Sequence, residues 1–441
     1  MNEQFGEKVK TIFDSITVLQ AKDSDLKRDN ANINGDSPMG AMLQYGANTA
    51  KEYNLEYLIK PAIAELHRDG WIHIHDLDFY AWTTTCTQIE LRKLFKNGFN
   101  TGHGHLRAPK SIGSYAALAA IAIQSNQNDQ HGGQSVVDFD YAMAEGVRYT
   151  YQKYLKEGYE ICERLNDLKD KEWILDYAME KTTRDTYQAM EGLIHNLNTM
   201  HSRAGAQVPF SSINYGTDTS WEGRLAIEQL LLATEAGLGN GETPIFPIQI
   251  FRVKEGVNYN PDDPNYDLFK LAMKVSAKRL FPNFAFIDAP FNLQYYKPGR
   301  PETEVAYMGC RTRVMGNIYD PSREIAPGRG NLSFTSINLP RLGIESKGDY
   351  LTFFKLLDKM LDATMQQLLD RYKIQASRIV RNFPFLMGEG VWMDSDGLSP
   401  DDTVGDVLKH GTLSIGFCGL AECLVAVSYT HLRAHETSQD L

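Results

Sequence analysis

Short apolar runs alternate with amphipathic helical patterns along this chain of 441 residues, and this alternation constrains the fold more than any other feature. Residues 244–251 and 283–288 are apolar runs beside prolines, which is typical of strands. Apolar residues recur at helical spacing over 219–238, 264–280 and 350–382. Strands separated by helices pair in parallel, and a parallel sheet is buried on both faces. The sequence therefore predicts an α/β fold around a buried sheet.

The rest of the chain extends this pattern without a break between domains. Apolar residues recur at helical spacing from Met39 to His67, and residues 70–76 alternate with period two, as a strand does. Residues 138–200 carry a long apolar stripe among lysines and glutamates, which predicts two or three amphipathic helices. We expect residues 1–36 to form an N-terminal helical arm and residues 37–427 to form one large domain.

Charge and cysteine content exclude several classes of protein. The 45 Lys and Arg against 56 Asp and Glu give a net charge of −11, which offers no general attraction to nucleic acid or to an anionic membrane. No apolar run approaches the roughly 20 residues that span a bilayer. The five cysteines lack Cys-x-x-Cys spacing and do not suggest a disulfide framework. We expect a cytoplasmic protein with free thiols that binds neither DNA nor a membrane.

Cys310 is the first candidate for chemistry. It lies between Gly309 and Arg311, in a stretch rich in glycine, proline and charge. A thiol on a flexible loop beside cations is a candidate reactive group. A lone cysteine is more often a small buried hydrophobe, so its surroundings in the fold must decide.

Cys86 is the second candidate. We expect it at the end of the strand after His73 and His75, where parallel sheets commonly build sites. The other cysteines fall on predicted helices and are expected to be structural: Cys162, Cys418 and Cys423.

Two His-x-His pairs support a different hypothesis. His73 with His75, and His103 with His105, have the spacing that can place two imidazoles on one side of a strand toward a metal. Such a site would hydrolyse its substrate with a metal-bound water. No later cluster of histidines or carboxylates completes the ligand set, so a metal-dependent hydrolase stays an alternative.

Nine segments in one order resemble the anaerobic ribonucleoside-triphosphate reductase family. The resemblance extends from about Asp25 to Ala426, and several long motifs in sequence are far more specific than a single cysteine. The segments are ANINGDSPMGAML (31–43), IHIHDLDFY (72–80), TTTCTQIEL (83–91), FNTGHGHLRAPKSI (99–112), DQHGGQS (129–135), RAGAQVPFSSINYGTDTS (203–220), YMGCRTRV (307–314), GRGNLSFTSINLPR (328–341) and GTLSIGFCGLAECL (411–424).

The resemblance implies a ten-stranded α/β barrel of the glycyl-radical enzyme and ribonucleotide reductase type. In that family two five-stranded parallel halves surround a central finger loop, and Cys310 matches the cysteine of that loop. The resemblance also implies that a glycyl radical oxidises this thiol to a thiyl radical. The thiyl abstracts the 3′ hydrogen of the ribose, so that the 2′ hydroxyl can leave as water.

Further residues and partners are implied in the same way. Cys86 matches a second cysteine and Asn331 a polar residue on the ribose face, a pair that resembles the branch of the family that uses formate as reductant. We expect the substrate triphosphate near Ser37, Ser336 and Asn338. The helices after Lys110 resemble the region where the family forms homodimers and binds a nucleotide effector. A radical-SAM activating enzyme is an implied partner.

Three parts of the family pattern find no match: a complete ATP-cone before Asp25, a zinc site of paired Cys-x-x-Cys motifs, and the loop whose glycine stores the radical. Residues 428–437, SYTHLRAHET, resemble a sequencing adaptor read in frame. We therefore expect residues 428–441 to be foreign, the barrel to be incomplete at its C-terminus, and the chain to be inactive alone. Structural zinc is expected only in the missing part, and no metal site in this chain.

Two further alternatives remain. A glycyl-radical lyase of the pyruvate formate-lyase type carries two adjacent cysteines on its finger loop, whereas Cys310 is flanked by Gly309 and Arg311. A catalytically inactive nucleotide-binding regulator would also lack the radical glycine. The cysteine pattern favours the reductase over the lyase.

Overall fold

The computed structural model describes residues 6–7, 10, 37–164, 171–202, 207–309 and 312–428. Within these ranges the centre of the fold is a mixed sheet in the order β1-β9-β2-β5-β6-β7-β8, with β10 paired to β9. Five neighbouring strands run parallel: β2 (Cys86–Ile89), β5 (Gln134–Val136), β6 (Ser211–Tyr215), β7 (Ile248–Val253) and β8 (Asn283–Phe286). The predicted α/β class with a buried parallel sheet is confirmed.

The chain reverses direction at β9 (Gly330–Asn338), which the sequence pattern did not predict. This strand runs antiparallel to β2 and to β1 (Ile72–Ile74), and parallel to β10 (Thr412–Cys418). Helical crossovers predict only parallel pairs, so this reversal lay outside that argument. The arrangement fits part of an α/β barrel, but the described strands do not establish the expected total of ten.

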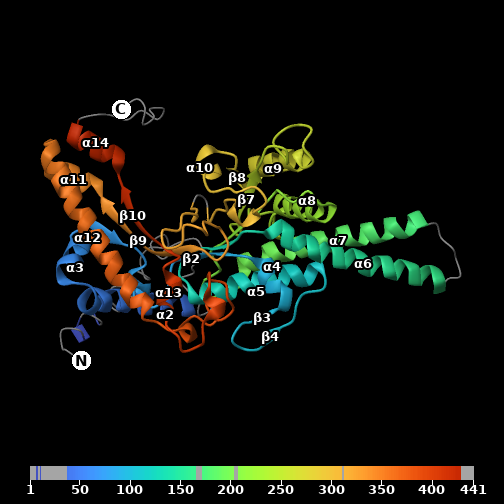
Figure 1. The fold of residues 1–441 in the computed structure, drawn as a ribbon, viewed down its shortest axis with the longest axis horizontal. Helices are drawn as coiled ribbons and strands as arrows, with labels where there is room; N and C mark the ends of the chain where they lie inside the picture. The colour runs from blue at the N-terminus through green and yellow to red at the C-terminus, as the bar shows by residue number, and fades with distance from the viewer. Residues whose placement is uncertain are drawn as a thin grey trace.

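Long helices cover the sheet and extend the molecule at both ends. Figure 1 shows α6 and α7 projecting as a helical hairpin at one end, while α11, α12 and α14 lie at the other. The major helices are α2 (Pro38–Tyr53), α3 (Pro61–Arg68), α5 (Ile112–Asp129), α6 (Phe139–Arg164), α7 (Lys171–Thr199), α8 (Trp221–Ala236), α9 (Tyr266–Arg279), α11 (Leu339–Ser346), α12 (Tyr350–Ala376) and α14 (Leu420–Ser428). These confirm the helical segments predicted from Met39 onward, whereas the predicted arm of residues 1–36 lies almost wholly outside the described residues.

Shorter elements complete the described fold. They are the helices α4 (Leu91–Asn97), α10 (Pro290–Leu293) and α13 (Gly405–Leu408), and the strands β3 (Phe99–Asn100) and β4 (His105–Leu106), which form a separate hairpin. None of the helices in the described ranges has an apolar stretch long enough to cross a bilayer.

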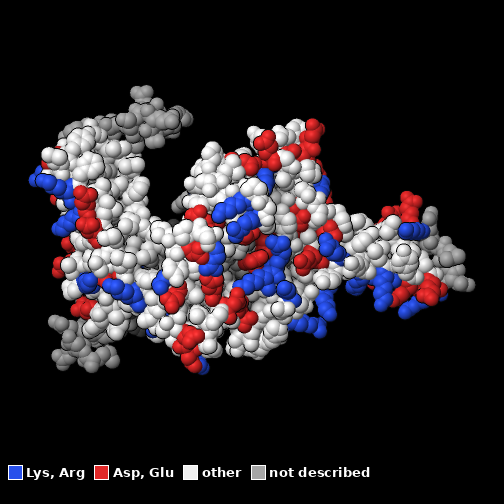
Figure 2. Space-filling model, in the orientation of Figure 1, with Lys and Arg blue, Asp and Glu red and all other residues white. Residues whose placement is uncertain are grey.

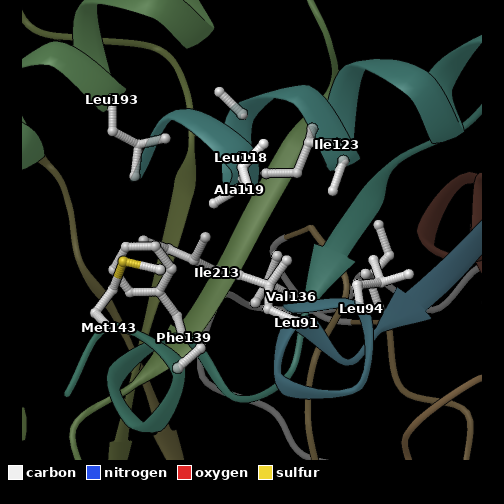
Figure 3. Close-up of a cluster of buried hydrophobic side chains, with 14 of the residues drawn as sticks. Leu91, Leu94, Leu118, Ala119, Ile123, Val136, Phe139, Met143, Leu193 and Ile213 are labelled. Carbon is white, nitrogen blue, oxygen red and sulfur yellow. The ribbon is translucent and has the colours of Figure 1, made fainter. Parts of the chain in front are cut away.

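The largest core lies between the parallel strands and the helices that cover them. In Figure 3 the side chains of Leu118, Ala119 and Ile123 on α5 point toward Val136 of β5 and Ile213 of β6. All five side chains are buried, and removing their apolar surface from water stabilises the position of α5 on the sheet. The sheet is therefore held rigidly on its helical side.

Two cysteine placements differ from the prediction. Cys86 does not end the strand after His73 and His75 but begins it, because Asp76 turns the chain with a φ of 49° and a short helix follows before β2 starts. Cys418 is the last residue of β10 and not helical, because the helix begins only after Gly419, whose φ is 69°. Cys162 and Cys423 lie on helices as predicted.

Asp129, at the end of α5, anchors a distant loop. Its Oδ2 atom accepts hydrogen bonds from the backbone N–H groups of Phe385 at 2.8 Å and Leu386 at 2.9 Å. Burial raises the pKa of Asp129 to about 6, although these two hydrogen bonds lower it. A buried carboxyl therefore titrates close to neutral pH within the core.

We expect this carboxyl to make stability depend on pH. A group whose pKa is raised by folding stabilises the fold when protonated, and this contribution is lost as the pH rises through about 6. Between about pH 5 and pH 7.5 the free energy of unfolding should fall by about 1.4 kcal/mol more in the wild type than in Asp129→Asn. Denaturant unfolding at both pH values measures this, and equal pH dependence in the two proteins would contradict it.

Candidate active site

Cys86 and Asn331 face each other across two antiparallel strands. Cys86 begins β2 and pairs with Asn331 near the start of β9, and the Thr85 N–H donates to the Asn331 carbonyl at 3.0 Å. Gly330 makes this approach possible, because a Cβ there would lie 1.9 Å from the Cys86 carbonyl oxygen. The two candidate residues that the sequence places 245 positions apart are therefore neighbours.

The environment of Cys86 keeps its thiol protonated. The residue is 5% exposed, and burial raises its pKa to about 11, although hydrogen bonds from the backbone and side chain of Asn331 lower it. Nucleophilic cysteines depend on the thiolate, which this environment disfavours. A neutral S–H group can instead give up a hydrogen atom.

Cys310 and Arg311 lie outside the described residues, but the segments on both sides of them are described. Met308 and Thr312 exchange two backbone hydrogen bonds, of 2.6 and 3.1 Å. Met308 and Val314 form a buried cluster with Cys86. Both flanks of the candidate radical cysteine therefore pack against the second candidate cysteine.

Polar side chains on the parallel strands hydrogen-bond the backbone of the segment that leads to Cys310. Asn214 on β6 donates to the Tyr307 carbonyl and accepts from the Tyr307 N–H, each at 2.9 Å. Ser135 on β5 donates to the same carbonyl at 2.7 Å. Because Asn214 and Ser135 are themselves buried in the sheet, Tyr307 has little freedom to move.

Two further contacts extend this support along the segment. Gln88 on β2 donates to the Ala306 carbonyl at 2.8 Å, and the Ser212 hydroxyl on β6 accepts from the Gly309 N–H at 3.1 Å. No motif or spacing in the sequence singled out Gln88, Ser135, Ser212 or Asn214. The signal that could have found them is the presence of polar residues inside strands that are otherwise buried.

Arg329 hydrogen-bonds the segment that follows Cys310. Its buried guanidinium donates to the carbonyls of His410 at 2.6 Å, Met315 at 3.1 Å and Gly316 at 2.7 Å. Burial lowers its pKa to about 10, so it stays charged at neutral pH. Arg329 ties the segment after position 312 to the loop before β10.

The residues predicted near the triphosphate occupy helix starts and a strand. Ser37 caps α2 by accepting from the Gly40 N–H at 3.0 Å, and Asn338 caps α11 by accepting from the Arg341 N–H at 3.3 Å. Ser336, on β9, contacts Nε2 of His75 at 2.9 Å. Helix starts are suitable places for an anion, and a shared triphosphate site at these residues stays a prediction.

The region after Lys110 contains a surface groove. Lys110 is exposed and lies two residues before α5, and its backbone N–H donates to the Ser114 hydroxyl at 3.1 Å. A cavity of about 470 Å³ lies between α5, α6 and α7. Small residues form much of its surface, among them Gly113, Ala117 and Gly192.

The described residues give the metal hypothesis no ligand set. No group of three or more histidines, cysteines or carboxylates in the described ranges could hold a metal ion. The rings of His73 and His75 lie 4.7 Å apart, and burial together with His73 lowers the pKa of His75 to about 4. His105 contacts the Asn97 carbonyl at 3.2 Å on the separate hairpin.

A second cavity, of about 410 Å³, lies beside the carboxyl ends of β2, β5 and β7. Its cations are paired: Arg92 with Asp138 at 3.0 Å, and Lys254 with Glu304 at 2.5 Å. Figure 2 shows acidic and basic side chains interspersed on this face, over the region that Figure 1 labels α4 and β7. The charges largely neutralise one another within the protein.

Comparisons with known proteins agree on one family. The family model described as anaerobic ribonucleoside-triphosphate reductase matches residues 29–441. The protein of that name from Escherichia coli (strain K12) is 33% identical over 383 residues, which cover 86% of this chain and 51% of that protein. The one from Enterobacteria phage T4 is 31% identical over 392 residues, covering 86% and 62%. The chain thus spans about half the length of its bacterial relative.

Solved structures support the same fold. A crystal structure of the anaerobic ribonucleotide reductase from Thermotoga maritima in complex with dATP and CTP matches with a TM-score of 0.59 and 17% identity. The match covers 88% of this chain and 61% of that one. At this identity the likeness supports the architecture alone.

We expect Gly330→Ala to disrupt the contact between β2 and β9. The added methyl group would overlap the Cys86 carbonyl, so the strands must separate, at a cost of about 3 kcal/mol in the free energy of unfolding. Gly397→Ala is the matched control, because no atom lies within 4 Å of a Cβ there, and its effect should stay within about 0.5 kcal/mol. Denaturant unfolding compares them; equal stability of the two variants would refute the close-approach argument.

Proposed function

The chain belongs to the anaerobic ribonucleoside-triphosphate reductase family, and from this premise we propose that its described domain holds the ribose of a ribonucleoside triphosphate during reduction to the 2′-deoxy product. The observation that carries the proposal is the buried cluster of Cys86 with Met308 and Val314, which lie on both sides of Cys310. Because the chain belongs to the reductase family, we no longer consider the glycyl-radical lyase and the metal-dependent hydrolase as alternatives.

The proposed chemistry uses two thiols with different roles. A glycyl radical in the whole protein would supply the oxidising equivalent that converts the Cys310 thiol to a thiyl. Cys310 then removes the 3′ hydrogen atom of the ribose, and the 2′ hydroxyl leaves as water with an added proton. The Cys86 thiol delivers a hydrogen atom to C2′ and is restored by formate, and Cys310 finally returns the 3′ hydrogen atom. Formate supplies the two electrons and becomes carbon dioxide. The neutral Cys86 thiol suits hydrogen-atom transfer, since burial disfavours its thiolate.

The remaining parts of the proposal concern recognition and partners. We place the triphosphate near Ser37, Ser336 and Asn338, where α2 and α11 begin. A radical-SAM enzyme would generate the glycyl radical. The four described cysteines are free thiols, which suits a protein that works in a reducing cytoplasm.

The groove between α5, α6 and α7 is the proposed place for dimerisation and for the nucleotide effector. Its small side chains allow another helix to approach closely, and Lys110 lies two residues before α5. The related Thermotoga maritima enzyme was crystallised with dATP and CTP, so nucleotides are the ligands to test first. We propose that a second copy of the chain packs on this groove.

Cys86→Ser should abolish formate-dependent turnover in the intact, anaerobically activated enzyme. A serine hydroxyl fits the same space, but its O–H bond is too strong to give up a hydrogen atom in place of the thiol. Conversion of CTP to the deoxynucleotide, followed by chromatography, measures the loss, which should exceed about a hundredfold.

Cys162→Ser is the matched control for this experiment, because Cys162 lies on α6 away from the cluster around Cys86 and should retain full turnover. Formate-dependent reduction that survives in Cys86→Ser would overturn the assignment of Cys86.

Ala117→Arg should prevent dimerisation. Ala117 is exposed within the groove, and an arginine would fill the groove and place a charge against the packed partner helix. Light scattering over a range of protein concentrations should show a dimer for the wild type and a monomer for the variant. Gln366→Arg, on the exposed surface of α12, controls for added charge. A dimer that survives Ala117→Arg would place the interface elsewhere.

A further inference from the structure

A third residue, Thr412, lies in register with Cys86 and Asn331 across the sheet. Thr412 begins β10 and pairs with Asn331 from the side opposite β2, so the three residues lie in register across β2, β9 and β10. The Thr412 hydroxyl donates a hydrogen bond to Oδ1 of Asn331. Neither the motifs nor the proposed chemistry gave Thr412 a role.

This hydrogen bond fixes the rotation of the Asn331 carboxamide, with Oδ1 turned toward Thr412. The carboxamide has one end that only accepts hydrogen bonds and one that only donates them. With Oδ1 held by Thr412, the NH₂ group is left for the other side, where Cys86 pairs in register with Asn331. Turning the carboxamide by 180° would exchange its two ends, so that the Thr412 hydroxyl would accept from the NH₂ group and the carbonyl oxygen would face Cys86.

The backbone is built to allow this arrangement. Thr412 pairs with Asn331, whereas the next residue, Leu413, pairs with Ser333, so Leu332 is an extra residue in β9. Such bulges change the direction of neighbouring side chains and are common beside active sites. Gly411 leaves room for the bulge, since a Cβ there would lie 2.7 Å from the Leu332 side chain.

We propose that Thr412 is a positioning residue, whose hydroxyl orients the Asn331 carboxamide so that its NH₂ group faces Cys86 and the ribose. The proposal rests on the proposed function, in which Cys86 and Asn331 line the ribose. It adds a specific requirement: Asn331 offers the ribose a donor, so the substrate atom that it contacts must be an accepting oxygen.

The test is nuclear magnetic resonance of the chain labelled with ¹⁵N-asparagine, in which loss of a signal in Asn331→Asp identifies the Asn331 side-chain NH₂ group. Cys86→Ala should shift this signal, because it removes the sulfur that the NH₂ group faces. In a Thr412→Val background the shift caused by Cys86→Ala should be largely lost, since the carboxamide can then rotate.

Thr412→Ser keeps the hydroxyl and should keep the full response to Cys86→Ala. Ser414→Ala, two residues further along β10, is the matched control and should also keep it. Thr412→Ala replaces Thr412→Val if the valine variant does not fold.

Two results would overturn the proposal. One is an Asn331 NH₂ signal that does not shift when Cys86→Ala is made in the otherwise wild-type chain, and the other is a shift that persists in the Thr412→Val background. None of these measurements needs turnover. If the signals behave as expected while Cys86→Ser remains an active reductase, the positioning role stands and the proposed function of Cys86 fails.

Discussion

The close antiparallel contact between β2 and β9 is the interaction on which the rest of the site depends. It joins two parts of the chain that run in opposite directions, and it requires a residue without a side chain at Gly330, because the Cys86 carbonyl occupies the space of a Cβ. The contact brings Asn331 to Cys86 and lets β10 add Thr412 from the other side. Without this approach, the parallel strands alone would place Cys86 beside no polar partner.

Buried polar groups on the parallel strands position the second component of the site. A buried amide or hydroxyl is costly unless it is hydrogen-bonded, and here the partners are backbone groups of the segment that leads to Cys310. Asn214 satisfies both the N–H and the carbonyl of Tyr307, and Ser212 receives the Gly309 N–H. The same hydrogen bonds therefore satisfy the buried polar groups of the sheet and position the segment that leads to Cys310.

Sequence patterns predicted the elements that depend on local periodicity. The helices within 138–200 and 350–382, and the strand at 283–288, follow from apolar spacing, and the structure confirms them. The prediction that Cys86 ends the strand after His73 and His75 was wrong. A turn at Asp76, with its positive φ, delays the start of β2 until Cys86.

The residues of the candidate site are brought together by contacts between segments that are far apart in the sequence. Asn331 was predicted from a family motif, whereas its contact with Thr412 depends on the register of β9 and on a bulge that no local pattern encodes.

The close packing around Cys86 also explains its chemistry. Packing by Met308, Val314 and the strand around Asn331 removes water, and an anion without water is unfavourable, so the pKa of the thiol rises. Asn331 counteracts this only in part, since its donors are neutral. The fold therefore keeps Cys86 as a source of hydrogen atoms, and a nucleophile at this position would need a cation that the described residues do not place beside it.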